Sequence, residues 1–209
     1  MEWTLTKIRA KIRKLTGRLS TSQLSDSELD DYINSFYQYL LPEELHLFEL
    51  DTWYEISTVN GTGEYALDVN MRSVVSPVTI DGKPIALSFD PTYFFNLYPR
   101  NEEATATKQE PTHCLVYDRI IYLRPIPDAV YVLRAAVPKR PNAMTQASDK
   151  PEDSAWGLFI AYGVAIDIHM DNGEKAEADE KVPYFEYLRG SIENKQLKQT
   201  ELKRSIPRF

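Results

Sequence analysis

One stretch of the 209-residue chain is apolar almost throughout: AWGLFIAYGVAIDIHM, residues 155–170. A helix with apolar side chains on all of its faces is covered on every side in a folded protein, because none of its faces suits water. The pair Asn172-Gly173 that follows is typical of a helix end. We therefore expect this helix to be the buried spine of a helical bundle, with the other helices packed around it.

Two amphipathic helices are predicted near the N-terminus. The first has apolar residues at steps of three and four, which places them on one stripe of a helix: Leu5, Ile8, Ile12 and Leu15. Gly17 follows as the helix stop. The second helix begins at Ser25, a good N-cap, and Glu28 stands where a capping box needs it. Its apolar stripe is expected to hold the following residues before Pro42 interrupts the helix: Leu29, Ile33, Phe36 and Leu40.

Short segments with strand-like composition, separated by turn residues, lie between residues 50 and 137. Hairpins are predicted at Asp81-Gly82 and at Asp118-Arg119. The segments 53–58 and 64–69 are predicted to be strands joined by Asn60-Gly61-Thr62-Gly63. About five to seven short strands with tight turns indicate an antiparallel sheet or a small sandwich inserted between the helical ends.

The predicted fold class is therefore α+β: a helical bundle built from N- and C-terminal helices, with an inserted antiparallel β-domain and an extended C-terminal arm. Pro183 is expected to break or kink the charged helix that follows residue 174. The end of the chain has no apolar core of its own and is expected to be ordered only where a partner holds it. The predicted segments, in chain order, are the N-terminal helical hairpin (1–49), the antiparallel β-region (50–137), the C-terminal helices that complete the bundle (138–202) and the extended arm (203–209).

Charge is distributed unevenly along the chain, whose formal net charge is −7. Residues 1–18 hold six basic residues against Glu2, and residues 195–209 hold five against Glu201, so the rest of the chain carries −16. Two interpretations stay open: a solvated helix face with a frayed tail, or basic ends that dock on acidic surfaces of neighbouring copies. The basic face of the first helix comprises Lys7, Arg9, Lys11, Arg13, Lys14 and Arg18.

The sequence predicts no catalytic, metal or cofactor site. His113 and Cys114 are adjacent, but successive side chains of a strand point to opposite faces, so they do not form a nucleophile–base pair. We expect Cys114 to be a core residue, and His46 and His169 stand apart from other metal ligands. A single cysteine excludes a disulfide framework and a zinc site of several cysteines. No apolar run reaches the roughly 18 residues that span a bilayer, and the amphipathic start is unlike a signal peptide, so we expect the protein to stay where it is made.

Two parts of the chain resemble the head-to-tail adaptor (connector) proteins of tailed bacteriophages. The first part is LTKIRAKIRKLTGR (residues 5–18), followed by LSDSELDDYIN (residues 24–34). The second part is the apolar helix at 156–168, the turn Asp171-Asn172-Gly173, a charged helix and a basic tail. The likeness covers both helical ends, and the strands at 50–137 are not matched residue by residue.

The resemblance implies a structural virion protein of the head–tail junction, assembled in the host cytoplasm, and not an enzyme. It implies a homo-oligomeric ring, typically a dodecamer, that lies below the portal protein, extends the DNA channel and offers a platform to tail or nozzle proteins. Genomic DNA would pass through without sequence-specific binding, and neither a membrane nor a cofactor is involved. The C-terminal arm would dock on the portal through these residues: Lys203, Arg204, Ile206, Arg208 and Phe209.

Two alternatives stay open. The first is another virion ring component, such as a stopper, a tail terminator or a nozzle subunit. The second is a carbohydrate- or host-binding module in the β-region, which requires an exposed aromatic platform. The candidates for such a platform are Trp53, Tyr54, Tyr93 and Phe94.

Overall fold

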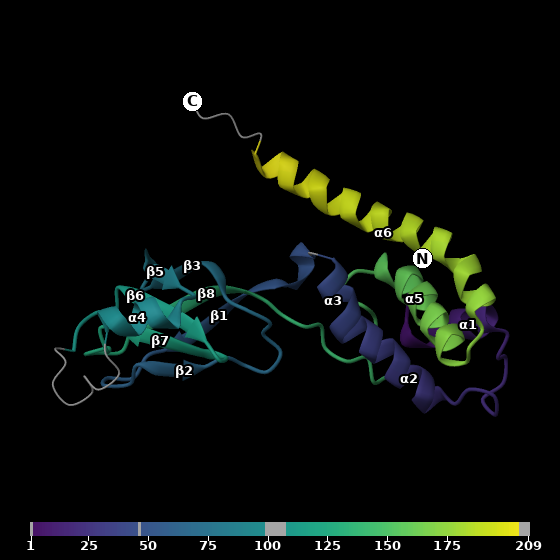
Figure 1. Ribbon diagram of the computed structural model, residues 1–209, viewed down its shortest axis with the longest axis horizontal. Coiled ribbons are helices and arrows are strands. Elements are labelled where there is room, and N and C mark those ends of the chain that lie inside the picture. The colour runs from purple at the N-terminus through teal and green to yellow at the C-terminus, as the bar shows by residue number, and fades with distance from the viewer. Residues whose placement is uncertain (1, 46, 99–107, 205–209) are drawn as a thin grey trace. The chain divides into compact units, whose positions relative to one another are not determined.

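The computed structural model describes residues 2–45, 47–98 and 108–204 (Figure 1). The chain divides into two compact units. The helical unit combines residues 1–50 with residues 140–209, and the β-unit comprises residues 51–139. The predicted α+β fold class is confirmed.

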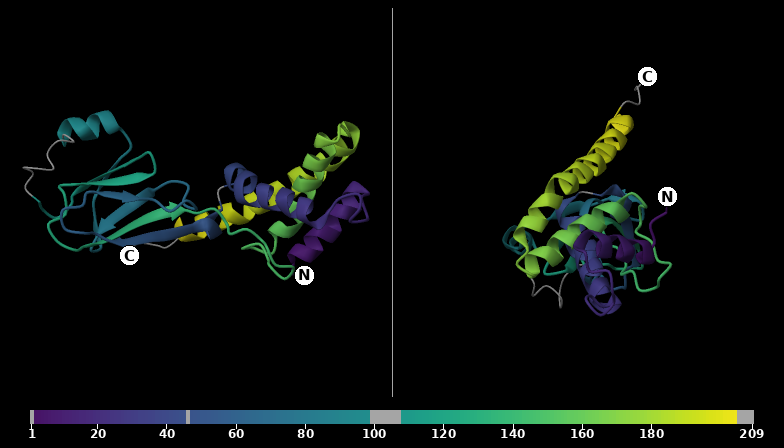
Figure 2. Two further views of the ribbon diagram at one scale, coloured as in Figure 1. Left: turned by 90° about the horizontal axis from the view of Figure 1, so that it is seen from below. Right: turned by 90° about the vertical axis from the view of Figure 1, so that its right-hand side faces the viewer.

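The helical unit is built around α5, the apolar helix. Most of its side chains are buried, and both α1 and α6 pack against it, as the views of Figure 2 show. Its core draws on both ends of the chain, because residues such as Leu5, Ile12 and Ile33 join Phe159 and Val164 in one cluster. The helices of this unit are α1 (Leu5–Thr16), α2 (Asp26–Ser35), the π-helical turn η1 (Phe36–Leu40), α3 (Leu41–Glu44), the 3₁₀ turn η2 (Phe48–Leu50), α5 (Trp156–Asp171) and α6 (Lys175–Arg204).

The predicted stop of α1 and the predicted N-cap of α2 are confirmed, whereas the predicted interruption at Pro42 is wrong, since the chain stays helical through η1 and α3 to Glu44. Gly17 ends α1 with a positive φ of 71°, a conformation that glycine adopts without the steric cost of a side chain. The Ser25 hydroxyl accepts a hydrogen bond from the Glu28 backbone N–H at 3.1 Å and so caps α2.

The predicted stripe of α2 is wrong at its end. Leu40 is 40% exposed, whereas Leu41 is fully buried. The reason is the π-helical turn, in which the Leu41 N–H bonds to the Phe36 carbonyl five residues back. The wider turn adds one residue, which rotates all later side chains by about 100° around the axis.

The long helix α6 is continuous through Pro183, so this proline does not end it. Side chains on both sides of Pro183 are buried in the unit, among them Ala178, Phe185 and Ile192. This packing stabilises the helix by more than the interior proline destabilises it. The helix continues to Arg204, two residues beyond the predicted boundary at 202.

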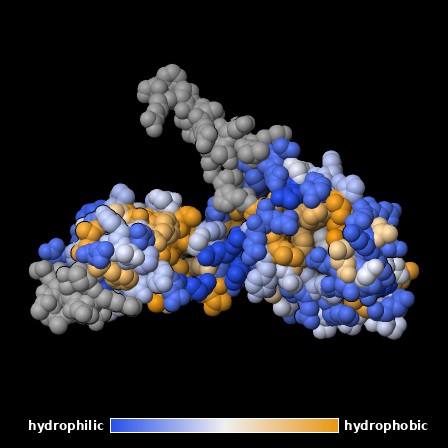
Figure 3. Space-filling view, viewed as in Figure 1, coloured by the Kyte–Doolittle hydropathy of each residue, from blue (hydrophilic) through white to orange (hydrophobic). Residues whose placement is uncertain are grey.

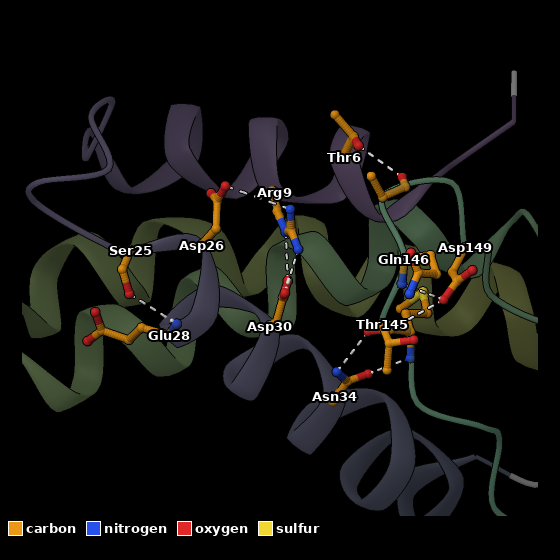
Figure 4. A network of polar contacts seen from close by, with 12 residues as sticks. Thr6, Arg9, Ser25, Asp26, Glu28, Asp30, Asn34, Thr145, Gln146 and Asp149 are labelled. Carbon is orange, nitrogen blue, oxygen red and sulfur yellow. Dashed lines mark hydrogen bonds and ion pairs between the residues drawn. The ribbon is translucent and has the colours of Figure 1, made fainter.

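The connector before α5 is bound to the N-terminal helices (Figure 4). The Asn34 amide bonds to Met144 twice, donating to its carbonyl at 3.0 Å and accepting from its N–H at 2.8 Å. Thr6 donates its hydroxyl to the Ala147 carbonyl at 2.9 Å. The Asp149 carboxylate accepts two backbone N–H groups of the connector turn, which lowers its pKa. Segments from opposite ends of the sequence are therefore joined by specific hydrogen bonds as well as by packing.

The β-unit is a sandwich of two four-stranded sheets, with strand orders β1-β8-β3-β4 and β2-β7-β6-β5. Apolar side chains of both sheets, such as Leu133 from one and Leu123 from the other, form a single core cluster. A short helix, α4 (Pro91–Leu97), begins after Asp90, whose carboxylate caps it. The strands are β1 (Asp51–Ser57), β2 (Glu64–Ala66), β3 (Val75–Ile80), β4 (Lys83–Pro84), β5 (Ala86–Ser88), β6 (His113–Tyr117), β7 (Ile120–Arg124) and β8 (Val132–Pro138).

Both predicted hairpins are confirmed. The Asp81-Gly82 turn joins β3 to β4, and the Asp118-Arg119 turn joins β6 to β7, with positive φ at both central residues of each turn. The two strands predicted on either side of Asn60-Gly61-Thr62-Gly63 are confirmed as β1 and β2. They lie in different sheets, because β1 pairs with β8 and β2 pairs with β7. The unit is also not purely antiparallel, since β5 and β6 run parallel.

Candidate assembly surfaces

Two arginines of the predicted basic face bind the neighbouring helix of their own chain. Arg9 Nε donates to Asp30 Oδ1 at 2.6 Å, and a second guanidinium nitrogen donates to Asp30 Oδ2 (Figure 4). This bond raises the pKa of Arg9. Arg13 donates to the Leu24 carbonyl at 2.6 Å and to Asp26 Oδ1 at 2.5 Å. Forked pairs of this kind fix orientation as well as charge, so these arginines lock α1 against α2.

Arg18 binds the start of α6. Its guanidinium donates to Glu174 Oε1 at 2.9 Å, while His169 Nδ1 lies 2.6 Å from Glu174 Oε2. These two bonds, His169 first, lower the pKa of the Glu174 carboxyl. The other ring nitrogen of His169 faces the Leu15 carbonyl at 3.4 Å. His169 is thus a buried link between α1, α5 and α6.

The three lysines of the basic face have a different environment. Lys7, Lys11 and Lys14 are spaced i, i+4 and i+7, which places them along one side of α1; we call this set the lysine stripe. Lys7 donates to the Glu2 carbonyl at 2.8 Å, and the Lys11 ammonium lies 5.3 Å from the centre of the Tyr162 ring. Within the described residues, none of the three forms an ion pair with a carboxylate. The predicted basic face therefore consists of two groups. The arginines are bound within their own chain, whereas the lysine stripe is available to a partner.

Two residues in the C-terminal half of α6 are also bound to other elements of the helical unit. Lys195 forms an ion pair with Asp153, which raises the pKa of the lysine, and Gln196 donates to Glu49 Oε2 at 2.6 Å. Lys203 and Arg204 lie in the last turn of α6. The remaining predicted arm residues lie outside the described residues: Ile206, Arg208 and Phe209. Docking of this arm stays a prediction.

The residues considered for chemistry lie in the protein core or are held by hydrogen bonds. Cys114 is buried, as predicted, and burial raises its pKa to about 12, so its thiol is protonated and unreactive. His113 Nδ1 lies 2.9 Å from the Thr112 hydroxyl and 3.0 Å from the Tyr98 hydroxyl. His46 lies outside the described residues. Over the ranges that the structure describes, no group of three or more potential ligands could hold a metal ion, and no helix is long and apolar enough to cross a membrane.

The aromatic platform predicted for a binding module does not form as a set. Tyr54 and Phe94 are buried in the β-unit, and only Trp53 and Tyr93 are exposed. Trp53 borders an open depression of about 470 Å³ on the outer face of its sheet. The guanidinium of Arg134 in this depression is already paired with Glu55, at 2.6 Å from Nε to Oε2.

A row of tyrosines and a pair of carboxylates in the helical unit were missed in the sequence. Tyr162 of α5 contacts Tyr184 of α6 at 4.8 Å between ring centres, and Tyr184 contacts Tyr187 at 5.8 Å. Asp179 and Glu186 lie seven residues apart on α6 and are both exposed. Hydrophilic side chains of this kind cover most of the helical unit on the face shown in Figure 3. The seven-residue spacing was a usable signal, because it places two side chains on one helix face.

The described fold is thus a helical unit with charged surfaces and an inserted β-sandwich. The chain matches the family model of the SU10 adaptor protein over residues 3–199, which is nearly its whole length. A search among curated proteins finds no match. The chain therefore belongs to the SU10 adaptor protein family and is a bacteriophage adaptor, a structural protein of the virion. The resemblance noted in the two helical ends is confirmed, and the match also spans the β-unit.

Proposed function

We propose that the protein is a head-to-tail adaptor that forms a homo-oligomeric ring, a dodecamer, below the portal protein. The ring extends the DNA channel at the head–tail junction and provides the attachment platform for tail or nozzle proteins. Genomic DNA passes through it without sequence-specific binding, and assembly takes place in the host cytoplasm. The observation that carries this proposal is the family match over residues 3–199.

The charges of the chain support a ring with an open channel. A closed ring needs a heterologous contact, in which one patch meets a different patch of the neighbouring copy. The lysine stripe of α1 and the exposed carboxylates of α6 offer two such different patches. The net charge of −7 also suits a channel through which DNA slides, since neutralising many phosphates would hold the DNA in place.

The portal contact is assigned to the arm at residues 203–209. Helix α6 carries the chain to Arg204, so the first two residues of the proposed arm are helical. A segment that folds only on its partner gives up conformational entropy at the moment of binding. Such a segment suits a step that takes place only once a finished portal ring is present.

The first test is the mass of the purified protein, measured by light scattering alone and after mixing with purified portal rings. We expect a defined complex of portal and adaptor, visible as a second ring by electron microscopy. A mixture whose components stay separate contradicts the proposal. Binding to an isolated tail tube or nozzle instead of the portal would assign the protein to the stopper, terminator or nozzle class, and retention on polysaccharide would favour the binding module.

The second test removes residues 203–209. We expect the melting temperature of the isolated protein to stay unchanged and portal binding to weaken at least tenfold. A chain with the same seven residues in scrambled order is the matched control for length and charge. A loss of thermal stability as large as that caused by a core substitution would contradict the assignment of these residues as a portal-binding arm, because it would mean that they pack on their own unit.

A further inference from the structure

The lysine stripe presents an uncompensated charge along α1. Helix α1 contains no acidic residue, and the two arginines beside the stripe are already bound to Asp26 and Asp30. Lys7 and Lys14 are exposed, and Ala10, also exposed, lies between them. Like charges at neighbouring positions of a helix repel one another. A partner with carboxylates at the same spacing would remove this repulsion.

Helix α6 carries such a pattern. Asp179 and Glu186, which we call the acidic stripe, are exposed and have no ion-pair or hydrogen-bond partner among the described residues. Val182 lies between them and is 37% exposed. Glu193 continues the same face, but Arg189 binds it at 3.2 Å. Arg189 also lies near enough to Glu186 to attract it electrostatically, but neither member of the acidic stripe forms an ion pair among the described residues.

The two stripes match residue by residue. Lys7, Ala10 and Lys14 have the spacing i, i+3, i+7, and Asp179, Val182 and Glu186 have the same spacing. Seven residues of helix span about 10.5 Å, so two straight helices lying side by side in parallel bring both lysines to both carboxylates at once. The same alignment places the small Ala10 opposite Val182. Both charge and side-chain size are complementary along this length.

The two stripes face different directions on one copy. Tyr184 marks the side of α6 that turns toward the lysine stripe, because it contacts Tyr162, whose ring lies under Lys11. Asp179 is five residues before Tyr184, which places it about 140° away around the helix. A contact between the stripes therefore joins two copies, and it joins different patches. Contacts of this heterologous kind propagate around a ring.

We propose that Lys7 and Lys14 of one copy pair with Asp179 and Glu186 of the next copy in the ring. This contact rests on the proposed function, in which the protein assembles as a ring. Exposed ion pairs contribute little energy singly and weaken with salt. They act mainly on partner choice and register, by excluding misaligned neighbours. The lysine stripe and the acidic stripe thus set the register in which neighbouring copies join.

Charge reversal and charge exchange test this contact on the full chain mixed with portal rings. One variant carries Lys7→Glu and Lys14→Glu, a second carries Asp179→Lys and Glu186→Lys, and a third carries all four changes. We expect each of the first two to lower ring formation at least tenfold at low salt, measured by native mass spectrometry. The third variant restores ring formation, because the charges have exchanged places. The matched control is Glu177→Lys with Glu180→Lys, an equal change on other faces of α6, which leaves ring formation unchanged.

The outcomes separate this contact from the function on which it rests. If the unaltered protein forms no ring with the portal, the proposed function and the contact both fail. If it forms rings but the four-residue variant does not regain them, the contact alone is overturned. A loss of binding to a duplex of random sequence in the lysine variant, with ring formation unchanged, also overturns it and assigns the lysine stripe to DNA.

Discussion

The two units of the molecule are assembled from the sequence in opposite ways. The β-unit is a continuous segment, residues 51–139, whose eight strands find their partners within it. The helical unit is made from both ends of the chain, and its central helix α5 packs on α1 across more than a hundred residues of sequence. The β-unit is therefore self-sufficient, whereas each half of the helical unit depends on the other half for its core.

The largest expected effect comes from separating the two halves. The isolated segment 51–139 keeps its fold, because both sheets and their common core lie within it. The isolated segment 1–50 does not fold, because the apolar faces of α1 and α2 lose α5, and short helices are marginal without packing. Circular dichroism and thermal melting of the two fragments measure the difference. A cooperative transition in fragment 1–50 would contradict the dependence of one half on the other.

The helical unit was the easier part to predict from sequence, because its signals are local. The stripe of α1, the stop at Gly17, the cap at Ser25 and the apolar helix α5 are each contained in a few neighbouring residues. The π-helical turn was not predictable, since the burial of Leu41 in place of Leu40 depends on packing with the rest of the unit.

Strand pairing in the β-unit was predictable only where a tight turn dictates it. The β3–β4 and β6–β7 hairpins follow from two-residue turns. The partner of β1 is β8, some eighty residues later, and no local signal names it. The basic face was hard to predict for the same reason. Arg9 is paired and the lysine stripe is not, and this difference depends on Asp30, which lies twenty-one residues away in the sequence.

A charge in the core of the helical unit gives the second-largest effect. Ile12 of α1 is fully buried in the core of the helical unit. Ile12→Asp therefore removes apolar burial and places a carboxylate in apolar surroundings. We expect a loss of at least about 4 kcal/mol in the free energy of unfolding, measured by urea titration. The control is Ala10→Asp on the exposed side of the same helix, which leaves the transition almost unchanged. Equal effects of the two substitutions would mean that Ile12 is not in the core.

A smaller effect tests how closely α5 is packed. A Cβ atom at Gly163 would overlap the ring of Phe36, which itself packs edge-on against Phe159 at 5.7 Å between centres. Gly163→Ala is therefore expected to cost about 2 kcal/mol through overpacking. Gly190→Ala on α6 is the matched control, because its Cβ would meet no atom within 4 Å, and it should stabilise the helix by about 1 kcal/mol. Stabilisation by both substitutions would contradict close packing at α5.

The smallest expected effect is a pH dependence that belongs to the helical unit. Burial raises the pKa of Asp167 on α5 to about 6, and the carboxylates of Asp171 and Glu44 add to the shift. Between about pH 4 and 6 the folded protein holds a proton on Asp167 that the unfolded chain has largely released, so the contribution of Asp167 to stability falls as the pH rises through this window.

Asp167→Asn tests this difference by removing the charged form. We expect the variant to be more stable than the unaltered protein by about 1 kcal/mol at pH 7. Most of this gain is lost near pH 4, where Asp167 is protonated in the folded protein and partly protonated in the unfolded chain. Urea titrations at both pH values measure the change, with Glu180→Gln as the exposed control on α6. The expected gain is below the full value of the shift, because water still reaches this side chain. A gain that is larger at pH 4 than at pH 7 would reverse the sign and show that Asp167 is stabilised as a carboxylate.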